Sequence, residues 1–199
     1  GKDGAITIEE ARSVTTSLNV IEGFRFDSGY VSNQFVTDKR RNIIKYDNAL
    51  ILVTDNKIET VEDLLPTLEV AARESRPLLI VCEDVEGQAL AALIMNTVRG
   101  SMRVAAVKAP RYGEERRNIL KDLAVAVGSK FVSREQGVSL REVTLSSLGS
   151  AKSIEVLKNS TTIAGGRGDM EQVEQRIELL KSELEQTDEL YECERVQER

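Results

Sequence analysis

Apolar runs alternate with amphipathic segments through most of the chain. The apolar runs are short, as in buried strands, and several are followed by a segment with helical periodicity. The pattern predicts strands at 5–10, around 17–22, and at 49–55, 77–83, 103–110, 130–133, 153–158 and 161–164, and helices at 60–75, 86–99 and 113–128. Because strands that alternate with helices usually pair in parallel, we expect an α/β fold with a mixed or parallel sheet flanked by helices. The highly charged, helically periodic residues 169–199 predict a C-terminal helical pair.

The predicted helix 86–99 is apolar around an unusually large part of its surface. At about 100° per residue, its apolar side chains sweep an arc of roughly 200°, whereas packing on one core requires a stripe of only about 100°. The members of this arc are Leu90, Leu93, Ile94, Met95 and Val98. The surplus is either buried by another part of this chain or exposed for a partner.

The predicted helix 60–75 is the natural neighbour of that helix. It carries Leu65 and Leu68 three residues apart, and Pro66 is expected to disturb its first turns. Two successive helices on one face of a sheet run side by side, so their apolar side chains would line a groove between them. From the residues alone, burial in the core is the simpler interpretation, although Met95 is a residue type that recurs at adaptable binding surfaces.

Composition narrows the possible functions. The chain has 199 residues, 41% of them hydrophobic and 30% charged, which is typical of a globular protein. Its net charge of −6 disfavours nucleic acid as the main partner, and no apolar run reaches the roughly 18 residues of a membrane helix. The absence of histidine excludes Ser-His-Asp and Cys-His catalysis and histidine-based metal sites. Cys82 and Cys193 are expected to be free thiols, and the start without Met suggests a piece of a longer chain.

Two segments could carry chemistry. The glycine-rich stretch 163–170 lacks the Gly-Lys-Ser/Thr ending of a phosphate loop, so we expect a strand-to-helix turn with Asp169 as the helix cap. Glu83, Asp84 and Glu86 follow a predicted parallel strand, where three carboxylates could hold Mg²⁺. The simpler interpretation is a solvated acidic loop before a helix. A small Mg-dependent α/β enzyme acting on a phosphorylated substrate through these three residues remains the alternative function.

Several blocks of the chain resemble one protein family. The blocks are "EGFRFDSGYVSNQF" (22–35), "LLPTLE" (64–69), "RPLLIVCEDVEGQALAALIMNTVRG" (76–100), "VAAVKAPRYGEERRNILKDLAVAVG" (104–128) and "LKNSTTIAGGRGD" (157–169). In this order they resemble the apical domain of a group I chaperonin of the GroEL type. The resemblance implies that residues 1–21 are a segment of the intermediate domain and 22–199 the apical domain. Residues 169–199 would then return toward the intermediate domain.

The resemblance also implies a function. An apical domain captures non-native polypeptides and the mobile loop of a GroES-type co-chaperonin, in this chain through an apolar groove between helices 60–75 and 86–99. The residues that match the family's binding positions are Tyr30, Phe35, Leu65, Leu68, Leu90, Ile94, Met95 and Asn96. No catalytic residue, cofactor or metal is expected in this segment.

Further expectations concern the longer parent chain and its setting. ATP and Mg would bind elsewhere in the parent, which would assemble with sibling subunits in a heptameric ring. The segment alone would be monomeric or weakly associated, with no nucleic-acid or membrane partner. The location implied is a bacterial-type cytoplasm or an organelle matrix.

The chain departs from the family pattern at a few positions. Ser28 stands where the family commonly has Arg, Asn33 and Gln34 replace a Pro and an aromatic residue, and Arg111-Tyr112 replaces Gly-Phe. These differences bear on the contacts of the closed state and on the range of clients.

Overall fold

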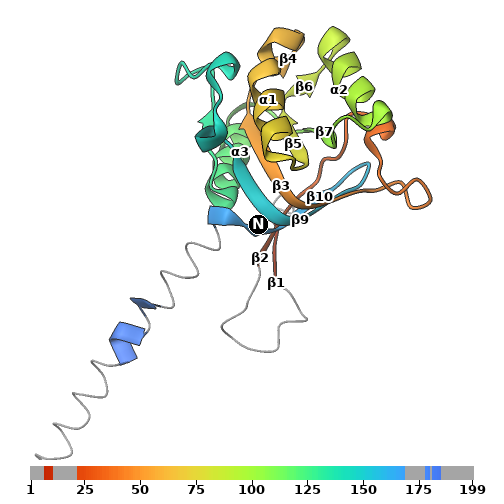
Figure 1. The fold of residues 1–199 in the computed structure, drawn as a ribbon. Helices are drawn as coiled ribbons and strands as arrows, with labels where there is room; N and C mark the ends of the chain where they lie inside the picture. Colours follow the sequence, from red (N-terminus) through yellow and green to blue (C-terminus); the bar gives the residue numbers. More distant parts are fainter. Residues whose placement is uncertain (1–6, 11–21, 169–177, 180, 185–199) are drawn as a thin grey trace, which may run out of the picture.

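The computed structural model describes residues 7–10, 22–168, 178–179 and 181–184, which form a mixed α/β structure (Figure 1). Within these residues an eight-stranded sheet has the order β1-β2-β10-β9-β3-β5-β7, with β8 also paired to β3. Its strands are β1 (Thr7–Glu10), β2 (Glu22–Phe26), β3 (Ile44–Thr54), β5 (Leu78–Cys82), β7 (Val104–Lys108), β8 (Phe131–Val132), β9 (Gly149–Val156) and β10 (Thr161–Gly166). A separate parallel pair joins β4 (Lys57–Ile58) to β6 (Asp84–Val85).

Strand β3 joins an antiparallel half of the sheet to a parallel half. Its first residues pair antiparallel with β9, as in Ile44 opposite Val156. Its last residues pair in parallel with β5 and β8. Strand β5 is buried at all five positions, as expected for a parallel strand that is covered on both faces. The predicted α/β class with a mixed sheet is confirmed.

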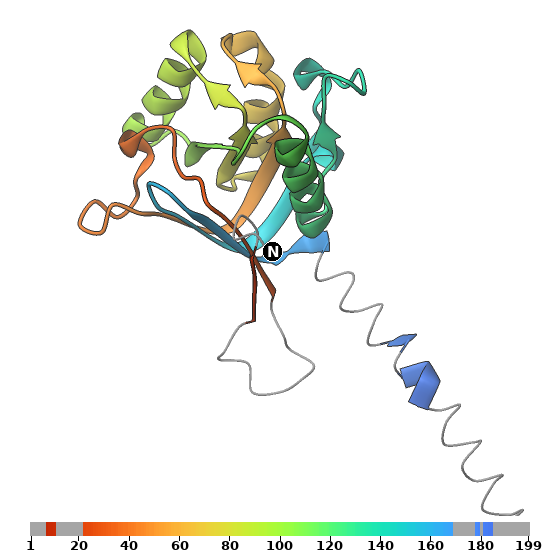
Figure 2. The same cartoon turned by 180° about the vertical axis from the view of Figure 1, so that it is seen from behind.

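The crossover rule explains where the helices lie. The helices are α1 (Leu65–Glu74), α2 (Gly87–Arg99) and α3 (Gly113–Val127). From β3 to β5 to β7 the chain moves across the sheet in one direction through α1 and α2, and α3 then carries it back to β8 on the other side of β3. Right-handed crossovers therefore place α1 and α2 on one face and α3 on the opposite face, as Figures 1 and 2 show.

The helix boundaries differ slightly from the predicted ones. The segment expected to form a helix from residue 60 begins as a 3-10 turn over Val61–Asp63, and α1 itself starts at Leu65. Pro66 lies in the first turn of α1, where a missing N–H costs no hydrogen bond. Glu86 precedes α2 as its N-cap, and α2 ends at Arg99, followed by the C-cap residue Gly100 with a left-handed backbone (φ 75°).

The glycines of the 163–170 stretch allow close packing of backbone on backbone. A Cβ atom added to Gly168 would lie 1.8 Å from the carbonyl oxygen of Val125, and one added to Gly166 would lie 2.3 Å from that of Ala126. Both carbonyls belong to the last turn of α3. The glycines thus let the end of β10 and the residues after it approach α3 closely. This close packing explains why the stretch is rich in glycine, and no phosphate-binding role is needed to explain it.

Some predicted features lie wholly or largely outside the described residues. These include the cap at Asp169, Cys193, most of segment 1–21 and most of the C-terminal helical pair. Residues 178–179 and 181–184 are helical, and β1 pairs antiparallel with β2. Cys82 is a free, buried thiol. Across the described parts of the chain, no helix is both long and apolar enough to span a bilayer.

Candidate functional site

Helix α2 presents apolar side chains both to the core and to the surface. Leu93 is fully buried, as expected for its sheet-facing side. Leu90 and Ile94 are partly buried and pack against the edge of the core. Farther around the helix, Met95 is 50% exposed and Val98 68% exposed. The apolar arc is therefore wider than this chain covers within the described residues, and its surplus is exposed.

Hydrogen bonds fix the orientation of α2 near its C-terminal end. The hydroxyl of Thr97 donates to the carbonyl oxygen of Val104 on β7 at 2.7 Å, which ties the helix to the sheet. Asn96 is half-buried, and its side-chain amide donates to the carbonyl oxygen of Ala92 in the same helix at 2.9 Å. The polar Thr97 interrupts the apolar arc, and its hydrogen bond to β7 explains why a polar residue is found there. With α2 held in this orientation, the side chains of Met95 and Val98 are exposed to solvent.

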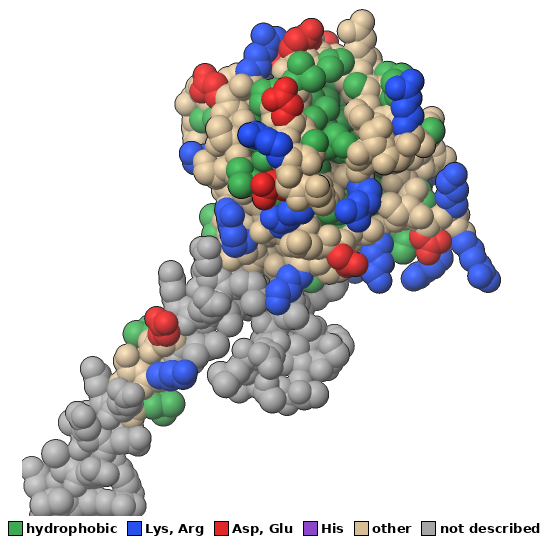
Figure 3. All heavy atoms as spheres, viewed as in Figure 1, with side chains coloured by type: hydrophobic (Ala, Val, Ile, Leu, Met, Phe, Trp, Pro, Cys, Tyr) green, Lys and Arg blue, Asp and Glu red, His purple; other side chains and the backbone are tan. Residues whose placement is uncertain are grey.

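Helix α1 contributes one exposed leucine to the same face of the molecule. Leu65 is 45% exposed, whereas Leu64 and Leu68 are buried in the core. In the space-filling view, apolar side chains gather in the region between α1 and α2 (Figure 3). The interhelical apolar surface is defined here by its accessible side chains: Leu65, Leu90, Ile94, Met95 and Val98.

Two residues expected to line the groove belong to the core instead. Phe35 is fully buried in the 3-10 turn Asn33–Phe35, which packs against α2 and β7. Leu68 is only 8% exposed because it lies on the side of α1 that faces the core. In this conformation both side chains lie beneath the accessible apolar side chains, and their part in binding stays a prediction.

Tyr30 lies beside β7, in the segment that leads to this turn. It forms an isolated antiparallel bridge with Val107, and its hydroxyl donates to the carbonyl oxygen of Asn42 at 3.2 Å. The side chain is partly buried and packs against the core. Tyr30 thus fixes the segment that supports α2, while part of its ring remains accessible.

The acidic cluster after β5 does not converge on a single point. Glu83 lies 3.8 Å from Arg116, Asp84 lies 3.8 Å from Lys108, and Glu86 lies 3.2 Å from Lys57. The hydrogen bond with Glu86 raises the pKa of Lys57. Each carboxylate therefore faces a different cation. In the part of the chain that the structure describes, no group of three or more Asp, Glu, Cys or His residues is placed to hold a metal.

The positions that depart from the family pattern lie in loops and turns. The carbonyl oxygen of Ser28 accepts a hydrogen bond from the Thr161 hydroxyl at 2.7 Å. Asn33 and Gln34 are exposed in the turn beside α2. Tyr112 is 83% exposed as the N-cap residue of α3.

Val98 is the member of the interhelical apolar surface that the predicted site did not include. The signal for it was present, because Val98 belongs to the apolar arc of its helix. No protein-family model matches the chain.

Proposed function

We propose that this chain is the polypeptide-binding apical domain of a group I chaperonin and that it captures non-native polypeptides on the interhelical apolar surface. The proposal joins two kinds of support. One is the order and content of the sequence blocks that resemble this family. The other is the exposure of apolar side chains on two adjacent helices, and this observation carries the proposal.

The chemistry of the surface suits a binding partner without a fixed sequence. Its members are aliphatic or thioether side chains, which attract any apolar group without directional requirements. Leu90 and Ile94 form a partly buried base, and Leu65, Met95 and Val98 project farther into solvent. An extended or helical segment laid between α1 and α2 would contact both layers, as in other helix-groove recognition. The mobile loop of a co-chaperonin would compete for the same surface.

The expected affinity of one domain is low. Complete burial of five such side chains would stabilise a complex by about 8–15 kcal/mol, and roughly half of that area is already buried. Association costs about 4–15 kcal/mol, so little net binding free energy remains. A ring of identical domains would raise the affinity by about 10²–10⁴ through effective concentration. On this proposal, ATP and Mg bind elsewhere in the parent chain, and the ring supplies the avidity.

The substitution Met95→Glu tests the proposal. It places a charge on the exposed part of the surface, where burial against an apolar client would require desolvation. We expect at least tenfold weaker binding of a fluorescently labelled, permanently unfolded protein in an anisotropy titration. Val125→Glu is the matched control, since Val125 is 58% exposed, against 50% for Met95, and lies on α3 across the sheet.

The outcomes distinguish a loss of binding at the interhelical apolar surface from a general effect of an added negative charge. The proposal expects the Val125→Glu protein to bind like the unmodified chain, and both variants to unfold at the same urea concentration as that chain. Equal weakening by both substitutions, or unchanged binding by Met95→Glu, would contradict the proposed surface.

A further inference from the structure

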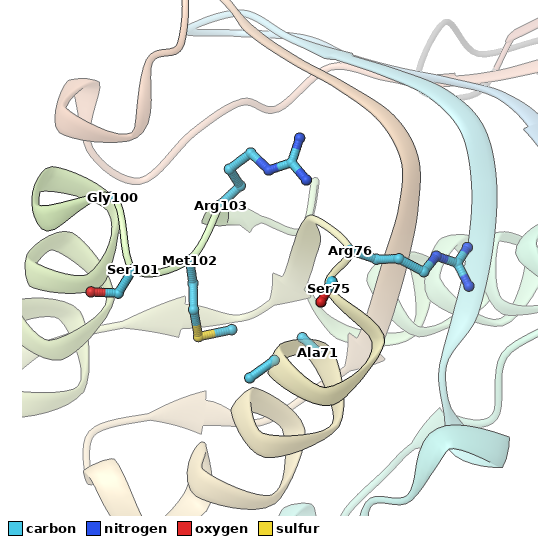
Figure 4. Close-up of a pocket in the computed structure, with 8 residues that line it drawn as sticks. Ala71, Ser75, Arg76, Gly100, Ser101, Met102 and Arg103 are labelled. Carbon is cyan, nitrogen blue, oxygen red and sulfur yellow. The ribbon is translucent and has the colours of Figure 1, made fainter.

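A cleft lies at the C-terminal ends of α1 and α2, where the interhelical apolar surface stops. It has a volume of about 310 Å³. Its lining includes Ala71 and Ala72 from α1, and Ser101, Met102 and Arg103 from the segment between α2 and β7. In Figure 4, Met102 projects into the space between the helices toward Ala71, and Arg103 extends above it. The cleft therefore combines an apolar floor with a cationic rim.

Arginines surround this end of the two helices. Arg73 and Arg99 lie in the last turns of α1 and α2, and Arg76 and Arg103 line the cleft. Arg76 donates from Nε to the carbonyl oxygen of Asn48 at 3.0 Å and from Nη2 to its Oδ1 at 3.1 Å, and Figure 4 shows its guanidinium turned away from Met102. Among the described residues, none of the four arginines forms an ion pair with a carboxylate.

The opposite ends of the helices carry several carboxylates. Glu59 and Glu62 are exposed in the segment before α1, and Glu86 is the N-cap residue of α2. Lys57 pairs with Glu86 at 3.2 Å, so this end carries both signs of charge, whereas the other end of the strip between α1 and α2 is rich in arginine. A ligand lying along it would be oriented by its own charges as well as held by apolar contact.

The stabilisation of helix ends accounts for only part of this pattern. A cation in the last turn offsets the partial negative charge of a helix C-terminus, which explains Arg73 and Arg99. Arg103 lies outside both helices, just before β7, and is exposed. Glu74, the last residue of α1, is exposed at the same end, so four arginines and one carboxylate leave three net positive charges there, which still exceed the two half-charges of the helix ends. The rim of the cleft is thus net attractive to an anion.

We propose that this cleft seats acidic side chains that flank one end of an apolar polypeptide segment bound between α1 and α2. This inference rests on the proposed function and specifies its substrate class and orientation. Helix α2 has 13 residues and so spans about 20 Å, which an extended chain covers with about six residues. The preferred ligand is therefore a stretch of about six apolar residues with Asp or Glu next to one end. Arg103 meets those carboxylates, and the Met102 floor continues the apolar contact.

The test uses the full 199-residue chain and two labelled peptides with blocked termini. Both share one six-residue apolar core, and one has two Asp residues at one end where the other has two Ser residues. Anisotropy titrations at low salt are expected to give about fivefold tighter binding of the acidic peptide, the size of one or two partly exposed ion pairs. The preference should disappear in Arg103→Gln and persist in Arg134→Gln. This control removes an exposed arginine that follows β8, at the opposite end of the parallel strands.

The outcomes separate this inference from the function on which it rests. If both peptides bind equally, the acidic subsite is overturned and the apolar capture stands. If neither peptide binds, the proposed function itself fails. A preference that survives Arg103→Gln would show attraction by net charge and would overturn the assignment to this cleft. If sedimentation velocity shows self-association that Arg103→Gln abolishes, a second copy of the chain is the occupant, which also overturns it.

Discussion

Leu93 and Val98 lie in one helix, and substitutions at these positions should have opposite effects. Leu93 is fully buried against the sheet, whereas Val98 is 68% exposed. Leu93→Ala leaves a cavity in the core and should lower the free energy of unfolding by about 2–5 kcal/mol. Val98→Ala removes two methyl-sized groups from an exposed helix position where alanine is the better helix former. Its free energy of unfolding should stay the same or rise by about 0.5 kcal/mol.

The effect of Val98→Ala on binding follows from the same exposure. The two lost groups would contribute about 0.8 kcal/mol each if fully buried by a client. Because about two thirds of the side chain is accessible before binding, the expected loss is about 1 kcal/mol, or roughly a fivefold rise in Kd. Urea unfolding followed by circular dichroism gives the stability, and anisotropy with a permanently unfolded protein gives the affinity.

Two results would refute the assignment of Leu93 to the core and Val98 to the binding surface. One is a loss of more than 1.5 kcal/mol in stability for Val98→Ala, which would mean that Val98 supports the core. The other is unchanged client affinity in Val98→Ala together with unchanged stability, which would remove Val98 from the binding surface. Leu93→Ala should bind the client normally under conditions where it remains folded.

Two further predictions concern stability. Gly168→Ala should destabilise the fold by about 1–3 kcal/mol in urea unfolding because its Cβ would lie 1.8 Å from the Val125 carbonyl oxygen, and an unchanged urea midpoint would contradict the close approach. Burial raises the pKa of the Cys82 thiol above its ordinary value of 9.0, so above pH 9 the unfolded chain releases a proton that the folded chain retains. The free energy of unfolding should therefore fall by up to about 1.4 kcal/mol per pH unit. Urea midpoints measured at pH 8, 9 and 10 should fall less steeply in Cys82→Ala than in the unmodified chain. Parallel pH profiles for the two proteins would contradict a contribution from the Cys82 thiol.

Local signals were sufficient to predict the parallel half of the sheet and its helices. Continuous apolar runs such as 77–83 can be stable only where both faces are covered, so they predict buried strands whatever the rest of the chain does. The antiparallel half was harder to predict. The first residues of β3 alternate between buried and exposed, as in Ile44 and Lys45, yet they follow an irregular segment and were not predicted to be strand. The start of α1 was also misplaced, because Pro66 is compatible either with a disturbed helix or with its first turn.

In the candidate site, too, the features set by local sequence could be predicted, and the features set by tertiary packing could not. Helical periodicity predicts that α2 has more apolar surface than one core requires, and the exposure of Met95 confirms this. Periodicity cannot tell whether Phe35 is exposed, because that depends on how the turn 33–35 packs against α2 and β7. The cleft beside Arg103 could not be predicted either, since it forms where the ends of two separate helices meet.

The separation of core and surface residues in α2 has a consequence for the proposed client range. Because Leu93 holds the helix while Met95 and Val98 remain outside the core, the exposed side chains can change without loss of folding. The exposed Asn33 and Gln34 lie in the turn that packs against α2, so this border of the helix is polar. On the proposed function, the apolar contact is confined to the strip between α1 and α2. Such a strip favours clients with one short apolar segment over clients with broad apolar surfaces, and the arginines at its end would select further among those segments by charge.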